Sequence, residues 1–195
     1  MRLRHPASYA VRMALTATMH RFDIELADSD RGVYKTLELR VARHPSEGAA
    51  FLLARVLAYC IEYEEGIAFS KAGISSVEEP AISICDLTGA RQAWIEVGAP
   101  SADRLHRASK ATPRVALYTD RRLDLLRTSL AGERIHRADK IPVTVFPQAF
   151  LRSLEATLER NMRWSVSIGD GHLYLTSGGV SFDTALEPQP LFEAS

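Results

Sequence analysis

Hydrophobic positions along the chain follow a period of two in its first part and a helical pattern after it. Alternation of apolar and polar residues over 14–26 and 33–42 predicts a hairpin of two strands with one face in solvent. A mostly apolar run begins after Ser46, a residue that favours a helix N-cap, and continues to about Glu65. We therefore expect a hairpin followed by a buried helix over 46–65.

Later segments alternate between short apolar runs and helical patterns. Two runs within 82–97 flank the loop of residues 87–92 and predict a second hairpin. A helix over about 102–111 and a strand over 115–118 come next, so a right-handed parallel crossover is expected. The remaining predicted elements are a helix near 120–131, a strand over 143–146, a helix from Pro147 to about Asn161, and strands over 163–168, 172–176 and 179–183. This order predicts an α/β (α+β) fold in which helices flank a mixed β-sheet.

Length and composition are those of one ordinary soluble domain. The chain has 195 residues, of which 46% are hydrophobic and 25% are charged. Residues 1–12 are expected to be a disordered extension, and residues 13–195 a single domain. No segment approaches the ~18 consecutive apolar residues of a membrane helix, and the first residues lack the apolar core of a secretory signal. We expect a cytoplasmic protein in which Cys60 and Cys85 are free, buried thiols.

Charge is balanced over the whole chain but not along it. Residues 47–86 carry seven acids and two bases, whereas residues 101–127 carry seven bases and three acids. An acidic pocket beside a basic flank is typical of a metal-dependent enzyme that acts on a phosphodiester. Two solvated faces of a neutral protein would give the same distribution.

Two acids in the second predicted hairpin are the first candidates for chemistry. Asp86 and Glu96 each lie among apolar residues, where an acid costs free energy unless it is paired or bound to a cation. A five-residue loop centred on Arg91 would place them opposite one another on one face, whereas a two-residue turn at Thr88-Gly89 would place them on opposite faces. They therefore form either a divalent-metal site or two solvent-facing acids of an edge hairpin.

A third acid, Glu47, opens the predicted helix and belongs to a narrow polar stripe on it. It is a further candidate metal ligand. Its negative charge would also simply stabilise the helix N-terminus, by ~0.3–1 kcal/mol.

Several short motifs resemble those of one bacterial family when they are taken together. They are His44-Pro45-Ser46-Glu47, Glu79-Pro80, Asp86 with Gly89, Trp94-Ile95-Glu96-Val97-Gly98, and Arg107-Ala108-Ser109 before the strand 115–119. In this combination and spacing the chain is similar to the YaeQ family over most of residues 13–190. That family is described as a variant of the PD-(D/E)XK nucleases. The resemblance implies a restriction-endonuclease-like core, with extra antiparallel strands from both termini.

The resemblance also implies roles for individual residues. Asp86 would be the aspartate of the nuclease motif, Glu96 its second acid and Glu47 the extra acid of the first core helix. Glu79 would line the same pocket. The usual lysine should follow Glu96 by two residues, where this chain has Gly98.

Two basic residues of the next predicted helix are candidates to replace the absent lysine of the motif. Arg107 or Lys110 would orient the attacking water or neutralise the scissile phosphate. An arginine stays protonated and cannot act as a base, although it can hold a phosphate.

Two functions follow from this resemblance. The first is a nuclease that depends on Mg²⁺ (or Mn²⁺) held by Glu47, Glu79, Asp86 and Glu96. The second is a catalytically degenerate member that binds nucleic acid or a protein in a transcription-related regulatory role. In either case a monomer is favoured, and DNA or RNA phosphates would be contacted by Arg104, Arg107, Lys110, Arg114, Arg121 and Arg122.

Overall fold

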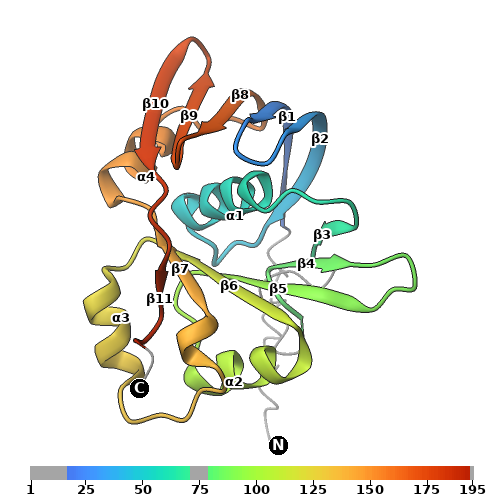
Figure 1. Cartoon of the computed structure of the whole chain (residues 1–195). Coiled ribbons are helices and arrows are strands. Elements are labelled where there is room, and N and C mark those ends of the chain that lie inside the picture. The colour runs from blue at the N-terminus through green and yellow to red at the C-terminus, as the bar shows by residue number, and fades with distance from the viewer. Residues whose placement is uncertain (1–16, 71–78, 194–195) are drawn as a thin grey trace, which may run out of the picture.

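The computed structural model describes residues 17–70 and 79–193, and its strands form two separate sheets (Figure 1). The expected extension over 1–12 lies outside the described residues. The first sheet has the order β10-β9-β8-β1-β2. It contains β1 (Thr18–Asp28), β2 (Val33–Arg43), β8 (Asn161–Gly169), β9 (His172–Ser177) and β10 (Val180–Ala185).

The second sheet has the order β11-β7-β6-β5-β4-β3. It contains β3 (Ile67–Phe69), β4 (Ile82–Cys85), β5 (Arg91–Val97), β6 (Arg114–Thr119), β7 (Pro142–Val145) and β11 (Gln189–Pro190). The helices are α1 (Ala49–Ile61), α2 (Ala102–Ala111), α3 (Leu123–Leu130) and α4 (Gln148–Glu155), with a short 3₁₀ turn, η2 (Ala138–Lys140). The predicted mixed α/β fold with helices on its sheets is therefore confirmed.

Strands from the two ends of the chain share the first sheet. β1 pairs with β2 in antiparallel register and with β8 in parallel register, so that Ile24 lies between Leu37 and Trp164. Along β1 and β8 buried residues alternate with exposed ones, as the hydrophobic pattern predicted. The strands β1, β2 and β8–β10 thus form a sheet of their own, while the two-residue strand β11 pairs with β7 at the edge of the second sheet.

Helix α1 lies between the two sheets and joins their inner faces into one core (Figure 1). Ten of its thirteen residues are buried, because both of its sides meet apolar strands. The main core contains residues of α1, of the first sheet and of one face of the second sheet, among them Phe22, Leu57, Ile95 and Trp164. Cys60 is buried there as a free thiol, and burial raises its pKa to about 12, whereas free Cys85 is partly exposed.

A smaller core covers the opposite face of the second sheet. There α2 and α3 contribute Leu105 and Leu126, which pack with Trp94, Leu117 and Val143 of the strands. Consecutive residues of β5 therefore point into different cores, Ile95 toward α1 and Trp94 toward α2.

Some boundaries differ from those predicted. The first helix begins at Ala49 with Gly48 as its N-cap, and the Ser46 hydroxyl is instead 2.6 Å from Nδ1 of His44. Helix α4 ends at Glu155, because the segment up to Asn161 turns to start β8. The short strands β3 and β11 have three and two residues and no alternating pattern that could have revealed them.

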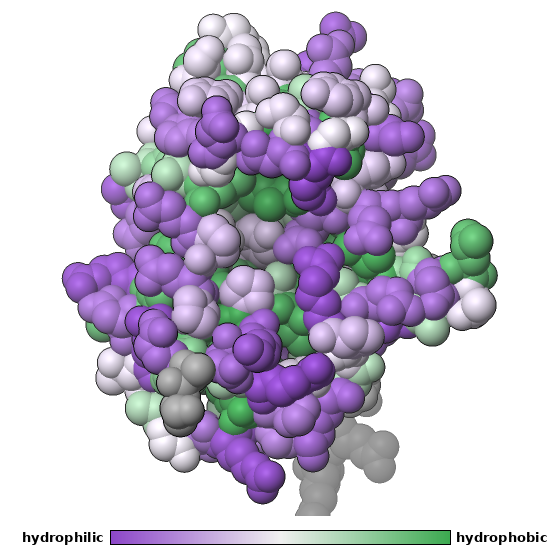
Figure 2. All heavy atoms as spheres, in the orientation of Figure 1, coloured by the Kyte–Doolittle hydropathy of each residue, from purple (hydrophilic) through white to green (hydrophobic). Residues whose placement is uncertain are grey.

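Hydrophilic side chains cover most of the face seen in Figure 2, and apolar areas between them are small. One exposed apolar residue, Leu87, lies in the β4–β5 loop. None of the helices in the described ranges is long and apolar enough to cross a membrane.

Candidate functional site

Glu96 is buried near the end of β5 and is held by two donors from neighbouring positions. Only 3% of the residue is exposed, and it lies on the same side of the strand as Trp94. Nε of Arg104, from the first turn of α2, lies 2.6 Å from Oε1 of Glu96. The indole N–H of Trp94 donates to the same oxygen. Burial raises the pKa of Glu96, and the Trp94 hydrogen bond and the Arg104 charge oppose that shift.

Arg104 also joins this acid to the segment that precedes β4. Its Nη2 donates to the backbone oxygen of Glu79 at 2.6 Å, and the Glu79 carboxylate accepts the Ser70 hydroxyl at 2.6 Å. The Arg104 guanidinium lies 5.8 Å from the centre of the Trp94 ring, within range of a cation–π contact. Two of the predicted metal ligands thus contact one arginine.

A cavity of about 390 Å³ opens beside this ion pair. Its walls come from Phe51 of α1, Ala81, and the turn from Val97 to Ser101, with Glu96 and Arg104 at one side. Gly98 in this turn has a φ of +92°, and a Cβ there would lie 2.9 Å from a ring carbon of Phe51. The position at which a nuclease motif would carry lysine is therefore one that only glycine fits without strain.

Glu47 is paired with a different arginine. Its Oε1 lies 3.1 Å from Nε of Arg55, and the two side chains are 1% and 3% exposed. Neither of these two atoms has a hydrogen bond of good geometry, although Oε2 of Glu47 accepts the backbone N–H of His44 at 3.0 Å. Burial raises the pKa of Glu47 and lowers that of Arg55, and each partner's charge opposes the shift of the other.

Asp86 lies in the loop of the β4–β5 hairpin and organises that loop. Its Oδ1 accepts hydrogen bonds from the backbone N–H groups of Thr88 and Ala90 and from the Thr88 hydroxyl, and Oδ2 accepts one from Gln92. The Thr88 hydroxyl is the main reason why the pKa of Asp86 is lowered.

The register of this hairpin keeps Asp86 away from Glu96. The loop has five residues, as one of the two sequence alternatives required, but it is centred on Thr88 and not on Arg91. Asp86 therefore faces Ala90, with its N–H 3.0 Å from the Ala90 oxygen. Six residues of nearly extended chain, roughly 20 Å, separate Ala90 from Glu96.

These positions do not fit a magnesium site. Within 17–70 and 79–193, no group of three or more His, Cys, Asp or Glu side chains is arranged to hold a metal ion. Mg²⁺ requires free carboxylate oxygens at near-octahedral geometry. Glu47 and Glu96 instead each have an arginine as counter-ion, and Asp86 accepts hydrogen bonds from its own loop. The predicted convergence of the three acids is not found, and the magnesium prediction has no support in this geometry.

The predicted phosphate-binding residues are also dispersed. Arg104 is held by Glu96, and Nη1 of Arg114 lies 2.5 Å from Oε2 of buried Glu62, which also accepts the Tyr118 hydroxyl at 2.8 Å. Arg114 begins β6, whereas Arg121 and Arg122 follow the end of that strand, and Arg122 is paired with Asp124 at 2.5 Å. Arg107 and Lys110 are exposed on α2.

The structure adds basic residues that were not assigned a role from the sequence. Hydrogen bonds join His106 and Ser109 of α2 to Arg134 and Arg137 of the segment that also contains His136, and partial desolvation together with the charges of these arginines, His106 and Lys110 lowers the pKa of His136. The signal available in the sequence was the run Arg134-Ile135-His136-Arg137, but its distance from α2 along the chain hid the contact.

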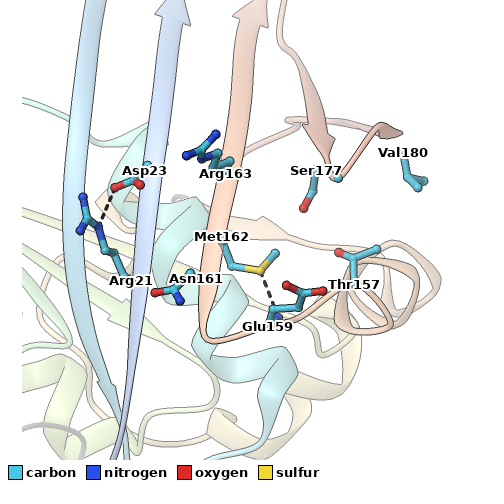
Figure 3. A pocket seen from close by; sticks show the side chains of 10 residues that line it. Arg21, Asp23, Thr157, Glu159, Asn161, Met162, Arg163, Ser177 and Val180 are labelled. Atoms are coloured by element: carbon cyan, nitrogen blue, oxygen red, sulfur yellow. Dashed lines mark hydrogen bonds and ion pairs between the residues drawn. The ribbon is translucent and has the colours of Figure 1, made fainter.

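A cavity of about 770 Å³ on the first sheet contains none of the predicted metal ligands (Figure 3). Arg21 and Arg163 line it together with Asp23 and Glu159, so its charges are balanced. Nε of Arg21 is 2.9 Å from Oδ1 of Asp23. The cavity therefore has no excess charge that would select an anion or a cation.

Comparison with known proteins agrees with this fold. The crystal structure of the YaeQ protein from Pseudomonas syringae superposes with a TM-score of 0.80 at 32% identity, covering 91% of this chain and 97% of that one. The YaeQ protein of Xanthomonas axonopodis pv. citri gives a TM-score of 0.78 at 28% identity, covering 89% and 97% of the two chains. The YaeQ protein of Escherichia coli (strain K12) is 27% identical over 165 residues, which are 84% of this chain and 91% of that protein. The family model described as YaeQ protein matches residues 13–186, and the chain belongs to the YaeQ family.

Proposed function

We propose that this YaeQ-family protein binds nucleic acid through its phosphates and does not cleave it with a resident metal ion. The observation that carries the proposal is that each buried acid of the candidate site is already paired with an arginine, Glu96 with the partly exposed Arg104 and Glu47 with the buried Arg55. A divalent cation would have to displace a guanidinium in each case. Binding without cleavage is the second of the two functions expected from the sequence.

Basic side chains on α2 and near it supply the attraction for phosphates. Arg107 and Lys110 are exposed on the helix, in a chain whose net charge is zero. A local basic surface on a neutral protein favours a polyanion bound at one place over nonspecific coating of the whole molecule. Phosphate contacts of this kind position a strand and read no sequence.

Fluorescence anisotropy with labelled single- and double-stranded DNA and RNA tests the proposal. We expect binding whose logarithmic affinity falls linearly with the logarithm of salt concentration, with a slope of about −0.7 to −0.9 per phosphate contact. Gel analysis of the same oligonucleotides in Mg²⁺ and in Mn²⁺ should show no products. Absence of binding to all four probes at low salt would contradict the proposal.

A metal-dependent nuclease, the first function expected from the sequence, is the second candidate, and its structural support is that Arg104 contacts both the Glu96 carboxylate and the backbone oxygen of Glu79. Isothermal titration calorimetry with Mn²⁺ distinguishes the two candidates. Heat from a specific site, together with Mn²⁺-dependent products on the gel, would favour the nuclease. A titration without heat and uncut oligonucleotides would favour the binding protein.

A further inference from the structure

Five basic or titratable side chains gather where the segment after α3 returns to α2. His106 and Lys110 are four residues apart and therefore share one face of α2. The returning segment, residues 131–137, is hydrogen-bonded to α2 at Arg134 and Arg137, and His136 lies between these two residues in the chain. Lys110, Arg134, His136 and Arg137 are exposed, and His106 is partly exposed. We call these five residues the α2–loop patch.

Hydrogen bonds fix this segment against the helix. Nδ1 of His106 lies 2.9 Å from the backbone oxygen of Arg134, and Nη2 of Arg137 lies 2.6 Å from the oxygen of Ser109 and 3.1 Å from that of Thr112. The Arg137 guanidinium thus satisfies carbonyls at the C-terminal end of α2, where a positive charge is favourable. These bonds hold Arg137 in a left-handed conformation with a φ of +50°, which an arginine seldom adopts. The backbone of the segment and the Arg137 side chain are therefore fixed against α2.

Positive charge in the patch is not cancelled by neighbouring acids. Within the described part of the chain, Lys110, Arg134 and Arg137 form no ion pair with a carboxylate. The surrounding acids are Asp103 on α2, Glu133 in the segment, and Asp139, whose Oδ2 is 3.4 Å from Nζ of Lys140.

His136 reports this excess of positive charge. Its pKa is lowered first by partial desolvation and then by the charges of Arg137, Lys110, His106 and Arg134. Because like charges raise the free energy of the imidazolium, an anion that neutralises them would bring the pKa back up. Since the Arg134 oxygen can only accept, Nδ1 of His106 carries the proton of that hydrogen bond.

We propose that the α2–loop patch is the surface on which this protein holds the phosphates of a nucleic acid. This inference rests on the proposed function and names the surface that performs it. The Arg137 guanidinium is fixed on α2, and the exposed side chains of Lys110 and Arg134 beside it form no ion pair within the described residues, which suits successive phosphates of one strand. Bound phosphates also favour protonation of His136, so affinity rises as the pH falls toward the range in which histidine titrates.

The double variant Lys110→Glu/Arg134→Glu tests the patch against a control of equal charge change. The control is Arg40→Glu/Arg163→Glu, which alters two exposed arginines on the outer face of the first sheet (Figure 3 shows Arg163). We expect the patch variant to lose at least about tenfold in affinity and about two contacts from the salt slope. The control should stay within about twofold of the unmodified protein. Circular dichroism and thermal melting establish that both variants are folded.

A pH series adds a readout that does not depend on charge reversal. From pH 8 to pH 6 the unmodified protein should gain affinity, and His136→Gln should gain less. Equal binding by the patch variant, the control and the unmodified protein would overturn the patch and leave the proposed function intact. Absence of binding by the unmodified protein would overturn both.

Discussion

Nε of Arg104 lies 2.6 Å from Oε1 of Glu96, and the two side chains are 19% and 4% exposed. A buried carboxylate needs a counter-ion, and from the sequence we expected a metal ion in that role. The counter-ion is an arginine from the next helix. An arginine in place of a metal ion changes what the site can do, because a guanidinium neutralises the acid but offers no water for attack on phosphorus.

Replacing Arg104 by Met should destabilise the protein in a pH-dependent manner. The folded-state pKa of Glu96 is already raised by burial, and loss of Arg104 would raise it further. A raised carboxyl pKa favours the folded state below the ordinary pKa of glutamate, and that contribution is lost as the pH rises through the raised value. We expect a loss of about 3–5 kcal/mol at neutral pH and a much smaller loss in acid. Urea denaturation at both pH values measures the difference.

The double variant Glu96→Gln/Arg104→Met is the control for this charge argument. It removes both charges, while the oxygen of the introduced amide can still accept from the Trp94 indole. The double variant should therefore recover most of the stability at neutral pH. A loss of the same size at acidic and neutral pH in Arg104→Met would show that packing, not charge, is responsible.

Replacing one partner of the Glu47–Arg55 pair should lower the free energy of unfolding more than replacing both. Its facing atoms, Oε1 and Nε, are 3.1 Å apart but lack hydrogen-bond geometry, and both side chains are almost completely buried. We expect Glu47→Met and Arg55→Met each to lose about 3–5 kcal/mol, and the double variant to lie near the unmodified protein or slightly above it. A double-mutant cycle by urea denaturation gives the coupling directly. Additive losses would contradict a coupled buried pair.

Asp86→Ala should lower the thermal midpoint by a few degrees without changing the response to Mn²⁺. The carboxylate accepts hydrogen bonds from Thr88, Ala90 and Gln92 within its own loop, so its removal loosens the hairpin tip. Its lowered pKa means that this contribution is present above the unfolded-state pKa and is lost as the pH falls through the folded value. The difference in thermal midpoint between the unmodified protein and the variant should therefore be present at neutral pH and disappear at strongly acidic pH. A Mn²⁺-dependent stabilisation abolished by the substitution would instead assign Asp86 to a metal site.

The sequence predicted most of the helices and strands but not the order of the strands in the sheets. Alternation along β1 and β8 and the apolar content of α1 predicted strands and a buried helix, because local patterns report which faces are covered. The parallel pairing of β1 with β8 depends on contacts between residues about 140 positions apart. No local pattern encodes that pairing.

The sequence pointed to individual acids but did not predict what they contact. Glu47 and Glu96 are buried, with exposed fractions of 4% and 3%, and each is paired with an arginine. Their arginine partners could not be chosen from spacing alone, because Arg55 and Arg104 reach them from helical positions eight residues away. The register of the hairpin could not be predicted without knowing the position of the turn. The bulge between Ile84 and Cys85 shifts that register further.

Variants of Gly98 test whether the turn after β5 requires glycine or has simply lost the lysine of the nuclease motif. A side chain there would face both a left-handed backbone, with a φ of +92°, and the Phe51 ring at 2.9 Å. Gly98→Ala should lower the free energy of unfolding by about 1–3 kcal/mol because of the left-handed backbone, and further because the added methyl group meets the Phe51 ring. Gly89→Ala is the matched control, because its φ is +84° and nothing lies within 4 Å of the added methyl group. Phe51→Leu should relieve part of the loss in Gly98→Ala and none in Gly89→Ala, as urea denaturation would show.

If Gly98→Lys were as stable as the unmodified protein and also gained Mn²⁺ binding, the site would be a nuclease centre lacking a single residue. Destabilisation without Mn²⁺ binding would show that the turn after β5 is built for glycine and that Arg104, not a metal ion, belongs beside Glu96.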